Sequence, residues 1–147
     1  MRDLIVLFCG LLLLWACSEE PDCNLDLGSN TVFVNFYDIE DSSELFLKFV
    51  QIRERSSDST FYTSEDSLSS FAVALNPDNS TVTYVFIGST DEDTLSLGYS
   101  KELRWISESC SPSFYYDELE VIGSSFTHEL SSTTIDVSID ENIKVYR

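Results

Sequence analysis

The chain of 147 residues is strongly acidic: 26 aspartate and glutamate residues outnumber eight lysine and arginine residues, which gives a formal net charge of −18 at pH 7. Because binding to a phosphate backbone depends on clustered lysine and arginine, and the basic residues here are scattered, we expect no nucleic-acid partner. With 43% hydrophobic and 13% aromatic residues, the composition also excludes a disordered chain and suffices for one domain with a core.

The N-terminus carries an apolar run over residues 4–15, behind a short head that contains Arg2. Spanning a bilayer takes about 20 apolar residues, so this run is too short to cross a membrane. It has the length of the hydrophobic region of a signal peptide. We therefore expect residues 1–16 to be a cleaved signal peptide.

The run ends in Leu14-Trp15-Ala16-Cys17, which resembles the lipobox of bacterial lipoproteins. The resemblance implies that the thiol of Cys17 receives diacylglycerol, that a peptidase cuts before this residue, and that the new amine is acylated with a fatty acid such as palmitate. Several acyl chains on one residue form a stable membrane anchor. The alternative is an ordinary secretory signal, with Cys17 free or paired.

An acidic stretch over residues 18–22 directly follows Cys17. It resembles the export signal that sends lipoproteins of Bacteroidota to the outer face of the outer membrane. The resemblance implies an outer-membrane protein exposed on the cell surface; a periplasm-facing position and a plain solvated linker are the alternatives. We expect residues 17–30 to serve as lipid anchor and acidic tether.

The cysteines support export independently. Cys9 lies in the segment expected to be removed and Cys17 is expected to carry lipid, which leaves Cys23 and Cys110. Two remaining cysteines in an exported chain most simply form one disulfide, which would pin the start of the folded domain to its body. A metal site would need further soft ligands, and a redox pair would be spaced C-x-x-C, a pattern that is absent.

Short runs rich in Val, Ile, Phe, Tyr and Thr recur along the rest of the chain, and their alternation of apolar and polar residues predicts strands. The predicted strands cover residues 31–37, 45–53, 60–63, 68–75, 81–87, 94–106, 115–122, 134–139 and 143–146. In the longest, the alternation slips by Leu103, which indicates a bulge or a break. We expect an all-β fold, an antiparallel sandwich of immunoglobulin-like or related type or else a barrel, as one domain over residues 31–147.

Several framework segments resemble a family of uncharacterised Bacteroidota lipoproteins that contain a domain of unknown function. The segments are Cys23, VNFYD at 34–38, LSLGYSKELRWISESC at 95–110 and NIKVYR at 142–147. The resemblance covers most of the chain after the signal peptide. It implies a secreted β-sandwich with Cys23 paired to Cys110, and it carries over no active site.

Little in the sequence indicates catalysis. His128 is the only histidine, expected at a surface or edge position between two strands, and residues 123–126 do not form the G-x-S-x-G motif of a hydrolase. Five glycines are too thinly spread for a phosphate-binding loop. We therefore expect neither an enzyme nor a cofactor.

Three acidic clusters, at residues 38–41, 91–93 and 117–120, offer the oxygen ligands that calcium prefers. None has the spacing of an EF-hand loop, and acidic turns are expected in a chain of this charge. No metal site is therefore predicted, although Asp91 and Asp93 are the first calcium candidates.

An aromatic group, Phe114-Tyr115-Tyr116, follows Cys110. Alternation places Phe114 and Tyr116 on one face of a strand and Tyr115 on the other. Packing in the core and against the disulfide is the expected use of these rings, and an exposed contact platform is the alternative.

Three tripeptides that begin with aspartate resemble the O-glycosylation sequon of exported Bacteroidota proteins. The resemblance implies glycan acceptors at Ser59, Ser67 and Thr94. All three residues lie at predicted turns, where a glycan can be carried.

Together these patterns predict a noncatalytic, lipid-anchored protein of the cell envelope that binds a protein partner, as an accessory subunit at the outer membrane. Contact with the membrane is expected through the lipid on Cys17 alone. The alternative is a surface module that binds a small ligand, a glycan or calcium. An exposed apolar patch or an uncovered sheet edge would favour the first function, and a concave pocket with converging polar groups would favour the second.

Overall fold

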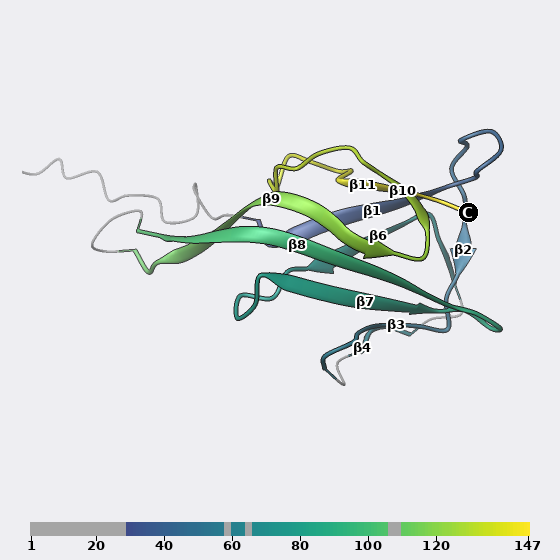
Figure 1. Cartoon of the computed structure of the whole chain (residues 1–147), viewed down its shortest axis with the longest axis horizontal. Coiled ribbons are helices and arrows are strands. Elements are labelled where there is room, and N and C mark those ends of the chain that lie inside the picture. Colours follow the sequence, from purple (N-terminus) through teal and green to yellow (C-terminus); the bar gives the residue numbers. More distant parts are fainter. Residues whose placement is uncertain (1–28, 58–59, 64–65, 106–109) are drawn as a thin grey trace, which may run out of the picture.

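A computed structural model of the chain describes residues 29–57, 60–63, 66–105 and 110–147, and every regular element among them is a β-strand (Figure 1). The predicted signal peptide over residues 1–16, Cys17, Cys23 and Ser59 lie outside the described residues. The strands are β1 (Thr31–Tyr37), β2 (Leu47–Lys48), β3 (Gln51–Glu54), β4 (Thr60–Tyr62), β5 (Ser67–Leu68), β6 (Ser70–Ala74), β7 (Thr81–Ile87), β8 (Glu92–Arg104), β9 (Ser113–Ser124), β10 (Thr127–Leu130) and β11 (Ile143–Tyr146).

The strands form two main sheets. One has the order β4-β3-β7-β8-β9, the other has the order β10-β11-β1-β6, and β2 pairs with β5 in a small third sheet. Among the pairs that the structure describes, β1 and β11 run parallel and the others run antiparallel. The all-β prediction is confirmed, and the arrangement is consistent with a β-sandwich.

The two main sheets share one hydrophobic core, because alternate residues of their strands point inward. In β1 these are Val32, Val34 and Phe36, all fully buried. The Phe36 ring meets the ring of Phe86 in β7 edge-on, with centroids 6.2 Å apart. Phe86 also contacts the rings of Phe49, Phe71 and Phe126, at centroid distances of 5.4, 6.4 and 5.5 Å.

The predicted strands 31–37, 81–87 and 143–146 are confirmed with the same bounds. The predicted strand 45–53 divides into β2 and β3 around Phe49, and the predicted strand 68–75 is interrupted at Ser69. Both breaks have one cause: the chain passes there between the small β2–β5 sheet and a main sheet. Alternation alone does not reveal that a run changes sheets.

The predicted strand 134–139 is wrong. Local side-chain hydrogen bonds occupy its backbone instead: Asp136 Oδ1 accepts a bond of 2.8 Å from the amide of Ser138, and Ser132 Oγ accepts one of 3.2 Å from the amide of Thr134. Such bonds compete with pairing between strands. The short, polar strand β10 was not predicted, and it lies at the edge of its sheet beside β11.

The β8–β9 hairpin extends beyond its neighbours. β7 pairs with β8 only as far as Gly98, whereas β8 and β9 remain paired from there to Arg104 and Ser113. In Figure 1 this end of the hairpin projects past β7 and β1, opposite the C-terminus. The predicted irregularity near Leu103 lies elsewhere, because the register shifts occur at residues 96–97 and 98–100.

Replacement of Phe86 by alanine tests the contact between the sheets. We expect Phe86→Ala to lower the free energy of unfolding by about 3–5 kcal/mol, because it leaves a cavity among four other aromatic rings. Urea unfolding followed by circular dichroism measures this loss. Val137→Ala is the control, since Val137 is 79% exposed and its truncation should leave the midpoint nearly unchanged.

Candidate functional site

A β-bulge in β9 lies beside a concavity on the five-stranded sheet. Gly98 pairs with Glu120 and Ser100 with Asp117, so two residues of β9, Glu118 and Leu119, stand opposite one residue of β8. Glu118 adopts a φ of 53°, in the left-handed region that side chains other than glycine rarely occupy. The bulge turns the edge of β9 toward the loop that joins β10 to β11.

Hydrogen bonds hold this loop, residues 131–142, beside β9. The amide of Leu119 donates to the carbonyl of Thr133 at 2.9 Å. At the far end of the loop the Asn142 side chain is buried, accepts a bond of 2.9 Å from the amide of Phe33 and donates one of 3.0 Å to the carbonyl of Thr134. The loop is thereby fixed both to the edge of one sheet and to β1 of the other.

Two adjoining hollows lie along the bulge, with volumes of about 610 and 450 Å³. They share Ser100 and Glu118, and we call them together the β9 groove. β8 and β9 supply its floor, and Thr133–Asp136 of the loop supply a wall. The residues that line the groove are Ser80, Thr81, Tyr99, Ser100, Glu102, Arg104, Tyr115, Tyr116, Asp117, Glu118, Leu119, Glu120, Thr133, Thr134, Ile135 and Asp136.

The groove is electronegative. Of its five carboxylates, Glu102 forms an ion pair of 2.8 Å with Arg104, the one basic residue in its lining. Four carboxylates have no basic residue beside them in the lining: Asp117, Glu118, Glu120 and Asp136. Burial raises the pKa of the tyrosine hydroxyls of Tyr99 and Tyr116, so these groups stay neutral and add no further negative charge at ordinary pH.

A family model described as a family of unknown function, DUF6452, matches residues 49–146. The chain belongs to the DUF6452 family. No curated protein and no solved structure matches it. The matched region of this DUF6452 chain includes every residue of the β9 groove, whereas β1 lies before the matched region.

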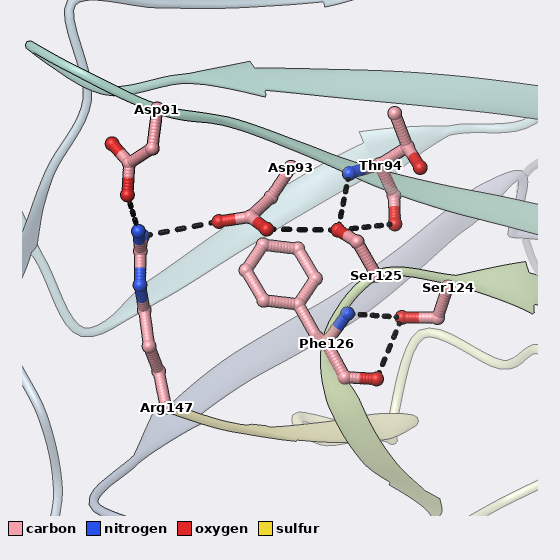
Figure 2. A network of polar contacts seen from close by, with 7 residues as sticks. All are labelled: Asp91, Asp93, Thr94, Ser124, Ser125, Phe126 and Arg147. Carbon is pink, nitrogen blue, oxygen red and sulfur yellow. Dashed lines mark hydrogen bonds and ion pairs between the residues drawn. The ribbon is translucent and has the colours of Figure 1, made fainter.

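The calcium candidates Asp91 and Asp93 both pair with one guanidinium in the DUF6452 structure (Figure 2). Arg147 reaches them from the end of β11, with 3.2 Å between its Nη1 and Asp93 Oδ2. Asp93 also accepts a bond of 2.8 Å from the hydroxyl of Ser125. A cation at these carboxylates would have to displace Arg147, and the described residues contain no group of three histidine, cysteine or acidic side chains that could hold a metal ion.

Cys110 is buried at the end of the hairpin, and its predicted bond to Cys23 stays a prediction because Cys23 lies outside the described residues. His128 is exposed at the edge of its sheet as expected, although within β10 rather than between strands. Phe114 and Tyr116 share a face, with ring centroids 6.4 Å apart, as alternation predicted.

Two predicted glycan acceptors lie in strands rather than in turns. Thr94 is half-buried in β8, where its amide donates a bond of 2.8 Å to the hydroxyl of Ser125. Ser67 is exposed in β5. The turn prediction is therefore wrong for both residues, and only Ser67 is exposed.

The sequence reveals part of the groove. The acidic cluster at 117–120 is visible in the sequence, but its position opposite Asp136 is not, because the alternation predicts a strand at 134–139. The signal that could have identified the loop is the density of Ser, Thr and Asp over residues 131–140, which favours local turns.

Among the described residues, no helix is long and apolar enough to cross a membrane.

The strain at Glu118 gives a testable consequence. We expect Glu118→Gly to raise the free energy of unfolding by about 1 kcal/mol, because glycine adopts a positive φ without steric cost. Glu120→Gly is the matched control: it removes a carboxylate from the same groove at a position without positive φ, and should lower stability by about 0.5–1 kcal/mol. Equal effects of the two variants in urea unfolding would contradict this account of the bulge.

Proposed function

We propose that the protein is a noncatalytic, lipid-anchored module of the cell envelope that binds a protein partner through the β9 groove. The observation that carries this proposal is the position of the groove along the last strand of the five-stranded sheet. Beyond Leu119, whose amide already bonds with Thr133, an edge strand offers backbone groups to an extended peptide, which can add to the sheet while its side chains enter adjoining hollows.

The charge of the groove selects the kind of peptide. Four uncompensated carboxylates within one concavity favour a segment that carries lysine or arginine. Tyr115, against whose ring Arg104 already lies at 4.6 Å, supplies an aromatic surface for such cations. The net charge of −18 suits the same role, since it discourages contact with other acidic proteins and attracts basic ones.

Anchoring completes the proposal. A signal peptide over residues 1–16, lipid on Cys17 and a Cys23–Cys110 disulfide would hold the domain at the outer membrane, at the surface of the cell or facing the periplasm. The burial of Cys110 is compatible with a structural disulfide.

A second candidate is a surface module that binds a glycan or another small ligand. It is favoured by the size of the hollows, about 610 and 450 Å³, which lies within the range of small-molecule sites. Calcium is less well supported because Arg147 binds both candidate carboxylates.

Photo-crosslinking in native envelopes tests the groove. A photoreactive amino acid at Thr134, in the wall of the groove, should capture one protein through a lysine- or arginine-rich segment, whereas the same group at exposed Glu44 should not. The double variant Asp117→Asn with Asp136→Asn should abolish the product, because it halves the uncompensated charge. The control with matched charge loss is Glu40→Gln with Glu44→Gln.

Each result decides between the candidates. A crosslinked basic segment that is lost only in the groove variant supports the proposed function. Equal capture from Thr134 and Glu44, or capture that is indifferent to the groove carboxylates, overturns it. If no protein is crosslinked and the groove instead binds a glycan on an array, the second candidate is established.

The anchor has its own test. We expect Cys17→Ala to move the protein from the membrane fraction to the soluble fraction and to remove the mass of the acyl chains, because Cys17 is the proposed attachment site. Fractionation and intact mass spectrometry measure both effects. A Cys17→Ala protein that stays in membranes with unchanged mass would exclude lipid at this position.

A further inference from the structure

The projecting end of the β8–β9 hairpin carries exposed apolar side chains. Leu103 and Phe114 are direct partners across the two strands and are 49% and 38% exposed, and Trp105 beyond them is 67% exposed. We call these three residues the hairpin strip. It continues the buried face of the sheet, because the Phe114 ring lies 6.4 Å from Tyr116, which in turn lies 5.7 Å from Tyr99 in the core.

The strip exists because the hairpin is longer than its neighbours. β8 contains 13 residues, whereas β7 contains seven and stops pairing with β8 at Gly98. Beyond that point the inward face of the hairpin extends past the opposite sheet, as the projection in Figure 1 shows. A cluster of large apolar side chains on such a surface indicates contact with another molecule or phase.

The charge at this end differs from that of the whole chain. Residues 101–116 contain Lys101 and Arg104 against two acids, Glu102 and Glu108, so this end is neutral in a protein with a net charge of −18. The Lys101 Nζ lies 5.7 Å from the centroid of the Phe114 ring, so a cation borders the strip itself. Tryptophan beside basic residues is typical of surfaces that rest in the headgroup region of a membrane.

The start of the described chain lies near the base of the same hairpin. The carbonyl of Asn30 accepts a bond of 2.7 Å from the amide of Leu75, and the next residue, Asn76, bonds with the Tyr99 hydroxyl through both its amide and its carbonyl. Cys17 precedes Ser29 by twelve positions, which span at most about 40 Å. A tether of this length from a lipid on Cys17 allows the hairpin end to reach the bilayer.

We propose that the hairpin strip docks into the headgroup region of the membrane that carries the protein. The proposal rests on the lipid anchor of the proposed function but not on the β9 groove. Trp105, Leu103 and Phe114 enter the interface, Lys101 beside the Phe114 ring faces the phosphates, and the acidic body stays away from the membrane. The lipid then determines attachment and the strip determines orientation.

Tryptophan fluorescence tests this docking without an added label. The sequence contains Trp15, within the proposed signal peptide, and Trp105, so emission of the mature protein reports on the strip alone. The native protein, purified with its own lipid, is reconstituted in vesicles of phosphatidylethanolamine and phosphatidylglycerol. We expect a blue shift of the emission, protection from acrylamide, and quenching by lipids brominated near the headgroup.

The outcomes separate docking from anchoring. If the protein floats with the vesicles but acrylamide still quenches Trp105, the docking proposal is overturned and the anchor proposal stands. Protection from acrylamide without vesicles, and without quenching by brominated lipid, shows that the chain's own N-terminal segment or a second copy covers the strip, and also overturns docking. A protein that neither floats nor carries lipid mass overturns both proposals.

Matched variants test the two parts of the surface. Lys101→Gln should lower the ratio of docked to undocked protein about fivefold in vesicles with anionic lipid, whereas Lys144→Gln, on the other sheet, should not change it. Leu103→Ser should reduce quenching, while Val137→Ser, at a more exposed position, should not. Equal responses within either pair would overturn the proposal.

Discussion

The contact between the two main sheets depends on the ring of Phe86. It meets aromatic rings from β1, from the residue that follows β2, from β6 and from the turn between β9 and β10, so it joins both sheets and the crossings between them. Each aromatic pair contributes beyond the area it buries. Without this cluster, β8 and β9 would have no fixed position relative to β1, and neither the groove nor the projecting hairpin would be defined.

The β9 bulge shows how local strain is offset by tertiary contacts. Glu118 pays the steric cost of a positive φ, yet the bulge allows Leu119 beside it to be almost fully buried and its amide to bond with Thr133. The same loop is fixed at its other end by the buried side chain of Asn142. Strain in one residue thus brings an edge strand and a loop together as two sides of one groove.

The parts of the fold that were predictable from sequence are those in which one strand stays in one sheet. The alternation in 31–37 directly reflects one buried face, and 81–87 follows the same pattern except that Val85 on its other face is buried as well, so the predicted bounds were right. The loop at 131–142 was misread because its conformation depends on Asn142 and Phe33, which are 109 positions apart in the chain. The acidic cluster at 117–120 was visible, but its position opposite Asp136 follows only from that distant contact.

Alternation along β8 also explains how one hairpin can carry two surfaces of different chemistry. Ser100, Glu102 and Arg104 line the groove, whereas Lys101, Leu103 and Trp105 alternate with them, and Leu103 and Trp105 belong to the hairpin strip. Because successive side chains of a strand point to opposite faces, a polar recognition surface and an apolar docking surface need no additional element. A membrane contact on one face would hold the other face near the bilayer, so a partner of the groove would itself have to be a protein of the membrane or its immediate surroundings.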